Sequence, residues 1–174
     1  RSSCSDRCSS RGGAWGACTS PHGLLALADG PHTFEVRATD AAGNTDATPD
    51  SHAWNIDTVL PAAPVITSPA DGTHTSDTTP TLTGTAEANS TVTIYDGVTP
   101  IGTTTADGSG NWSFTPGSPL AEGAHYFAAT ATDAASNEGP SSNQVEVTID
   151  TTDPTTSLDS TPPADDNDPT PDFT

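Results

Sequence analysis

The sequence contains no lysine and no methionine, and all four of its arginines lie within the first 37 residues. Against 23 Asp and Glu residues they leave a formal net charge of −19. A nucleic-acid site needs cations that neutralise phosphates, and attraction to an anionic membrane surface needs them as well. Both partners are therefore excluded. No stretch approaches the roughly 20 apolar residues of a membrane span, so membrane insertion is not expected.

Cysteine is confined to Cys4, Cys8 and Cys18. No C-x-x-C pair or Cys/His cluster at zinc spacing is present. Cys8 and Cys18 bracket a hairpin-like turn at residues 11–14, so we predict a disulfide between them, which would suit an extracellular protein. Cys4 is then left over, either free or paired with a segment outside this sequence.

Catalytic signatures are also missing. The sequence has no G-x-S-x-G elbow, no H-E-x-x-H pair and no Gly-rich phosphate loop, and we expect no enzyme active site. Apolar residues make up only 31% of the chain, a fraction that can indicate disorder. Here, however, Val, Ile, Phe and Trp alternate with polar residues at strand spacing, which favours thin β-sandwiches with modest cores.

The chain repeats itself with a period of about 93 residues. Residues 27–61 align without a gap with residues 120–154, sharing the blocks Ala-Thr-Asp-Ala-Ala-x-Asn and Ile-Asp-Thr. A fixed period indicates a tandem array of one structural unit. We therefore expect 1–57 to be the C-terminal part of one unit, 58–150 a complete unit, and 151–174 the N-terminal part of a third, within a longer protein.

The complete unit is predicted to be all-β. Short alternating segments bounded by Gly, Pro and Asp are typical of strands, and Trp112, Phe114, Phe127, Ile94 and Val147 should form the core. Seven such strands in about 90 residues, with no helical period, indicate a two-sheet immunoglobulin-like sandwich of antiparallel strands. The predicted strands are 64–67, 79–85, 91–95, 101–105, 112–114, 125–131 and 144–149. Residues 1–57 would supply strands three to seven of the preceding unit.

Linkers between the units are short. Residues 57–61 and 150–154 each end in proline, which fixes the backbone angle φ. Successive units should therefore sit end to end on stiff connections.

Four runs of sequence resemble the bacterial Ig-like repeats of large surface adhesins: 91–97 (TVTIYDG), 110–116 (GNWSFTP), 131–135 (ATDAA) and 149–151 (IDT). The first unit resembles a disulfide-bearing relative of that repeat. Such repeats also space the domains of secreted hydrolases. His32 and His125 stand where members of the family commonly have Tyr.

Two sets of residues have competing interpretations. His32 and His125 occupy the same repeat position, and we interpret them as structural residues hydrogen-bonded to nearby backbone rather than as metal ligands. Trp54 and Trp112 lie on predicted strands and are interpreted as core or sheet-covering residues, the alternative being a sugar-stacking role.

Acidic and amide residues recur where the end of one sandwich meets the loops of the next. Asp40 and Asp133, with Asn44 and Asn137 four residues on, follow the sixth strand, and Asp57 and Asp150 end the seventh. Oxygens from several segments are what calcium prefers, although Asp and Asn also simply form turns. We predict calcium at the first junction, with Asp57, Asp133, Asn137 and either Glu87 or Asn89 as ligands, and a weaker half-site prepared by Asp150 and Asp153.

Taken with the resemblance, these features predict a non-catalytic spacer or stalk segment of a secreted bacterial cell-surface adhesin, with neighbouring Ig-like repeats of the same polypeptide as its partners. The alternative is a carbohydrate-binding or spacer module of a secreted polysaccharide-degrading enzyme. That alternative needs aromatic side chains exposed on one face.

Overall fold

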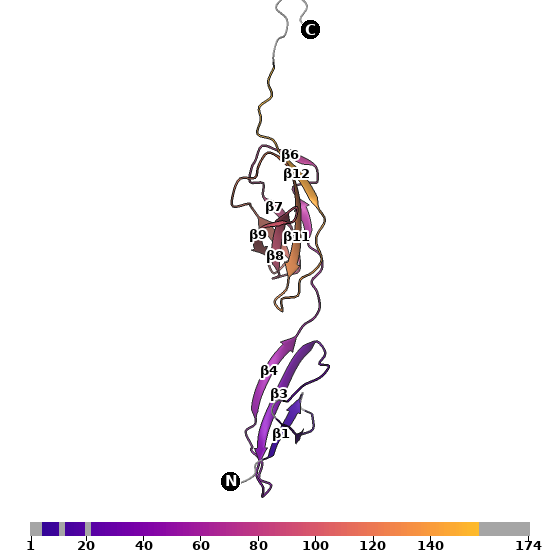
Figure 1. The fold of residues 1–174 in the computed structure, drawn as a ribbon, viewed down its shortest axis with the longest axis vertical. Helices are drawn as coiled ribbons and strands as arrows, with labels where there is room; N and C mark the ends of the chain where they lie inside the picture. Colours follow the sequence, from indigo (N-terminus) through magenta and orange to yellow (C-terminus); the bar gives the residue numbers. More distant parts are fainter. Residues whose placement is uncertain (1–4, 11–12, 20–21, 157–174) are drawn as a thin grey trace, which may run out of the picture.

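A computed structural model of the chain describes residues 5–10, 13–19 and 22–156. These residues form twelve β-strands and no helix, so the described part holds no helix that could cross a membrane. Strands β1–β4 and β5–β12 form two separate β bodies, joined by the extended linker 57–64 (Figure 1).

The second body is a sandwich of two sheets, a three-stranded sheet in the order β10-β7-β5 and a five-stranded sheet in the order β6-β12-β11-β8-β9. Every strand pair is antiparallel except β6 with β12. The strands are β5 (Val65–Ser68), β6 (Thr73–Thr75), β7 (Leu82–Thr85), β8 (Thr91–Asp96), β9 (Thr99–Thr105), β10 (Asn111–Phe114), β11 (Gly123–Thr132) and β12 (Val145–Ile149). The all-β sandwich fold predicted from the sequence is confirmed.

All seven predicted strands have counterparts in this body, and β6 is an eighth strand that the sequence did not predict. Its residues Thr-His-Thr lack the apolar alternation by which the other strands were recognised. β6 follows the turn at Gly72 (φ 77°) and pairs in parallel with β12 at the edge of the larger sheet.

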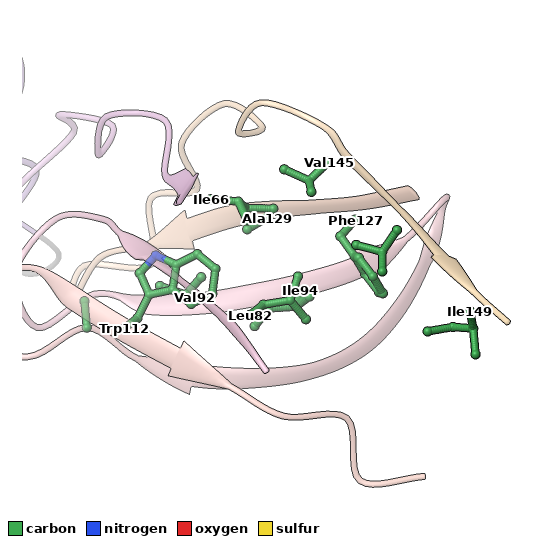
Figure 2. Close-up of a cluster of buried hydrophobic side chains, with 11 residues drawn as sticks. Ile66, Leu82, Val92, Ile94, Trp112, Phe127, Ala129, Val145 and Ile149 are labelled. Atoms are coloured by element: carbon green, nitrogen blue, oxygen red, sulfur yellow. The ribbon is translucent and has the colours of Figure 1, made fainter. Parts of the chain in front are cut away.

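The core lies between the two sheets (Figure 2). The smaller sheet contributes Ile66, Leu82 and Trp112, and the larger contributes mainly Phe127, Ile94 and valines of β8 and β12. Phe127 is fully buried while its neighbour Tyr126 is 41% exposed, as the predicted alternation requires. Phe114 is half-buried and packs against the edge of this core.

The first body is one four-stranded antiparallel sheet in the order β2-β1-β3-β4. Its strands are β1 (Ser5–Ser10), β2 (Gly16–Ala17), β3 (Gly30–Thr39) and β4 (Asp50–Ile56). The β3–β4 pair has the register of the β11–β12 pair shifted by the repeat period, because Gly30 pairs with Ile56 as Gly123 pairs with Ile149. The sequence predicted strands three to seven of a sandwich here, but the four strands that the described residues of this body form all belong to one sheet.

Candidate functional site

The site that the sequence singled out is the junction where linker 57–64 reaches the second body. Pro61 and Pro64 of the linker are buried, while Val59 and Leu60 between the two bodies are 66% and 59% exposed. The linker is thus laid against the sandwich from Pro61 onward.

Asn137 holds the start of the linker. Its side-chain Nδ2 donates to the backbone carbonyl of Asp57 (3.0 Å) and to Oδ2 of Asp133 (2.8 Å). Oδ1 of Asp133 in turn accepts the backbone N–H groups of Ala135 and Asn137, each at 2.8 Å. The hydrogen bond from the Asn137 side chain, supported by these N–H groups and opposed by partial burial, keeps the pKa of Asp133 below its usual value. Asp133 therefore remains ionised and keeps the Asn137 amide aimed at the linker.

Two further residues of the same loop contact the linker and the strand that follows it. The N–H of Gly139 donates to the carbonyl of Ala131 on β11 (2.8 Å). In this position Gly139 lies close to the carbonyl oxygen of Pro61. A Cβ atom at this position would lie well inside van der Waals contact with that oxygen. The side chain of Asn143 receives the N–H of Ile66 (2.9 Å) and donates to its carbonyl (3.2 Å). Segment 137–143 therefore grips residues 57–66 at three points.

The Asp-x-x-x-Asn arrangement of Asp133 and Asn137 is a local loop motif that occurs three times among the residues that the structure describes. Asp40 with Asn44, and Asp107 with Asn111, make the same carboxylate contacts to the N–H groups two and four residues on. The Asn44 amide also donates to Asp40 Oδ2 at 2.8 Å. In the described chain only the third copy also reaches another segment, through Asn137 to Asp57.

Glu87 and Asn89, the other ligands predicted at this junction, have backbone partners of their own. The Glu87 carbonyl accepts the N–H of Ser90 (3.1 Å), and the N–H of Asn89, whose φ is 64°, donates to the Ala106 carbonyl (3.1 Å) just after β9. Asp57 Oδ1 accepts the N–H of Val59 (3.1 Å), Asp150 Oδ1 that of Thr152 (3.0 Å), and Asp153 is exposed. Over residues 5–10, 13–19 and 22–156 there is no group of three or more His, Cys, Asp and Glu side chains that could hold a metal ion.

Two of the predicted oxygen donors already have a partner. The Asp57 carbonyl and the Asp133 carboxylate both accept the Asn137 amide N–H, whereas a calcium ion takes six to eight oxygen ligands. As placed, Asn137 forms an amide bridge between these two residues, and calcium at this junction remains a prediction.

Cys8 and Cys18 are joined by a disulfide across the β1–β2 hairpin, with their Cα atoms 5.7 Å apart. Cys4 lies outside the described residues. The hairpin is further held by the Ser9 hydroxyl, which donates to the Gly13 carbonyl (2.8 Å). The guanidinium of Arg37 on β3 lies 4.0 Å from the ring centre of Trp15, a cation–π contact.

Residues 67–151 match the family model of the bacterial Ig-like domain. This part of the chain belongs to that family. The resemblance predicted from the sequence is confirmed over this unit. No curated protein matches the chain in sequence.

Among solved structures, fibronectin(III)-like modules of CbhA from Clostridium thermocellum share the fold, with a TM-score of 0.52 at 14% identity over 83% of this chain and 77% of theirs. The chain also matches the BSP domain of a biofilm-associated protein (21% identity, TM-score 0.40, 88% of this chain and 26% of that one). A third match is a tetra-tandem repeat in the extending region of a large adhesion protein (23% identity, TM-score 0.41, 86% and 42%). The chain thus spans about a quarter and two fifths of the last two structures.

Proposed function

We propose that the chain is a non-catalytic spacer segment of a secreted bacterial cell-surface adhesin, in which the grip of segment 137–143 on the linker keeps successive Ig-like units in a fixed orientation. The observation that carries this proposal is the linker contact: Asn137 bound to the Asp57 carbonyl, Pro61 buried, and Gly139 in close contact with the Pro61 carbonyl. A freely jointed linker would leave these groups to water. Membership of the bacterial Ig-like family supports an extracellular setting.

We infer no catalytic role for the described residues. Several of their aspartates, Asp107 and Asp133 among them, accept backbone N–H groups of their own turns. Units of this kind act by their length and stiffness, and the acidic surface keeps them soluble.

The carbohydrate-binding alternative depends on exposed aromatic side chains. Trp112 is 4% exposed and belongs to the core, so it offers no face to a sugar. Trp54 is half-buried on β4, with the rings of His32 and His52 stacked 5.7 and 5.9 Å away. This aromatic row is the one observation that favours the alternative, and glycan binding that is lost in Trp54→Ala without unfolding would support it.

Nuclear spin relaxation tests the spacer proposal on the whole chain. If the linker is held, backbone ¹⁵N relaxation in β3–β4 and in β11–β12 will report one common, long rotational correlation time. If the units are freely jointed, each body will report its own shorter time and the spacer proposal fails.

Calcium at the junction stays a prediction. In the same relaxation experiment, calcium and chelator at constant ionic strength separate the two views. An amide-bridged junction will be equally rigid in both, whereas a calcium-dependent junction will be rigid only with calcium and will loosen in Asp57→Ala.

A further inference from the structure

The linker is also held where it leaves each unit. Oγ1 of Thr58 donates to both carboxylate oxygens of Asp29 (3.0 and 3.1 Å). At the equivalent position 93 residues on, the N–H of Thr151 donates to Oε1 of Glu122 (3.1 Å) and its hydroxyl bonds the same oxygen. Thr152 adds a hydroxyl contact to Oε2 (3.1 Å). The acid and the first threonine are 29 residues apart in both cases.

The carboxylates are carried by two loops of the same construction, Ala28-Asp29-Gly30-Pro31-His32 and Ala121-Glu122-Gly123-Ala124-His125. Gly30 and Gly123 have φ values of 116° and 117°, a conformation that residues with a Cβ rarely adopt. Nε2 of His32 donates to the Ala28 carbonyl (2.7 Å), and Nε2 of His125 to the Ala121 carbonyl (2.9 Å). The structural interpretation of both histidines is thus confirmed.

Strand register brings the acid and the threonine together. Gly30 pairs with Ile56 and Gly123 with Ile149, so the acid just before the glycine lies beside the chain just after the last strand. The histidine bond closes the loop on the carbonyl next to the acid, which limits how far the carboxylate can swing. The hydroxyl contacts, with burial opposing them, keep the pKa of Glu122 below its usual value, as expected when bonds favour the charged form.

We call these three residues the exit clamp: the acid (Asp29 or Glu122), the threonine two residues after the last strand (Thr58 or Thr151), and the histidine that closes the acid's loop (His32 or His125). We propose that the exit clamp sets the direction in which the linker leaves each unit. Asp29 and Glu122 are then positioning residues, and the spacing pattern Ala-[Asp/Glu]-Gly-x-His followed by Ile-Asp-Thr marks the clamp in sequence. This inference rests on the proposed spacer function. It adds a second hold on linker 57–64, made by the first body, whereas Asn137 belongs to the second.

Thr58→Val tests the clamp because valine keeps the β-branched shape and removes only the hydroxyl. One exposed hydrogen bond is lost, so exchange of the Val59 amide, whose N–H donates to Asp57 Oδ1, should rise about three- to tenfold. The common correlation time of the two bodies should split. Thr58→Ser, which restores the hydroxyl, should return both readouts to wild type, and Asp29→Ala should reproduce the effect of Thr58→Val.

Thr103→Val is the matched control, since Thr103 is exposed on β9 and no side-chain hydrogen bond of it is present in the described structure. It should change neither readout. A wild-type chain with two separate correlation times would refute the spacer function itself. A wild-type chain with one correlation time that Thr58→Val leaves unchanged, with unchanged exchange, would refute the clamp alone.

Discussion

Gly139→Ala is the sharpest perturbation of the junction. Gly139 does not have a positive φ, so alanine can adopt its backbone conformation without strain. Its N–H is fixed to the Ala131 carbonyl on β11, which prevents the loop from retreating. The new methyl group would overlap the Pro61 carbonyl, and because that atom is backbone, the linker must move away.

The cost follows from what the linker loses. Pro61 is buried, and its ring presents three CH₂ groups that contribute about 0.8 kcal/mol each when removed from water. Exposing them therefore costs about 2 kcal/mol. The lower entropy of the unfolded alanine chain offsets about 0.4–1 kcal/mol of this. The net loss of about 1–2 kcal/mol corresponds to a fall of about 5–15 °C in the melting temperature of a domain this size.

Thermal unfolding of the whole chain measures the loss, and ¹⁵N relaxation shows whether the two bodies become independent. Gly117→Ala is the control, because Gly117 is exposed, has no positive φ and nothing within 4 Å of an added Cβ. It should leave the melting temperature unchanged or slightly raised. If Gly139→Ala behaves like this control in both measurements, Pro61 is not held against the loop and the account of the junction is wrong.

Three further outcomes are expected. Gly84→Ala places a Cβ that overlaps the Val65 carbonyl oxygen and the edge of the Trp112 ring. Overpacking of this kind should lower the free energy of unfolding by about 1–3 kcal/mol, measured by denaturant titration. Burial opposes the charged form of His125, but the hydrogen bonds to the Ala121 carbonyl and to the Asp96 carboxylate (2.6 Å) outweigh it and raise the His125 pKa above 6.5. The protonated histidine therefore stabilises the fold fully below pH 6.5, and this contribution is lost as pH rises through the folded pKa. Above that pH, the wild type should lose stability relative to His125→Gln. Equal melting temperatures in calcium and in magnesium, unaffected by Asp57→Ala, would show that divalent ions only screen charge at the junction.

Much of the sandwich was predictable because its core strands alternate strictly. In β8, Val92 and Ile94 are buried and their neighbours are not. In β12, Val145, Val147 and Ile149 are buried and alternate with Glu146 and Thr148. Strand β6 was not predictable, because its side chains are polar and its only partner is the edge of β12. Its existence depends on a long-range pairing that no local pattern records.

The sequence repeat predicted where the junction lies, but it did not predict which contacts are made there. Asp133 and Asn137 recur at the period, yet the same two residue types serve equally as turn acceptors and as metal ligands. Only the placement of the Asn137 amide toward the Asp57 carbonyl separates the two roles. The role of Gly139 could not be predicted from the repeat, because the first unit has Asp46 at the equivalent position. The N–H of Asp46 donates to the Ala38 carbonyl (2.9 Å), as that of Gly139 does to Ala131.

The surplus of aspartate over glutamate, 18 against 5, has a local cause in many of the turns. Asp40, Asp46, Asp77, Asp107, Asp133 and Asp150 each accept the backbone N–H two residues on. Glutamate, one methylene longer, does not favour this short-range contact. Part of the acidity of the chain thus belongs to its turns. Hydrogen bonds to Asn44, Thr48 and Asn111 keep the pKa values of Asp40, Asp46 and Asp107 below 3.8, so these turns stabilise the fold above that pH and lose their contribution as pH falls through the lowered values.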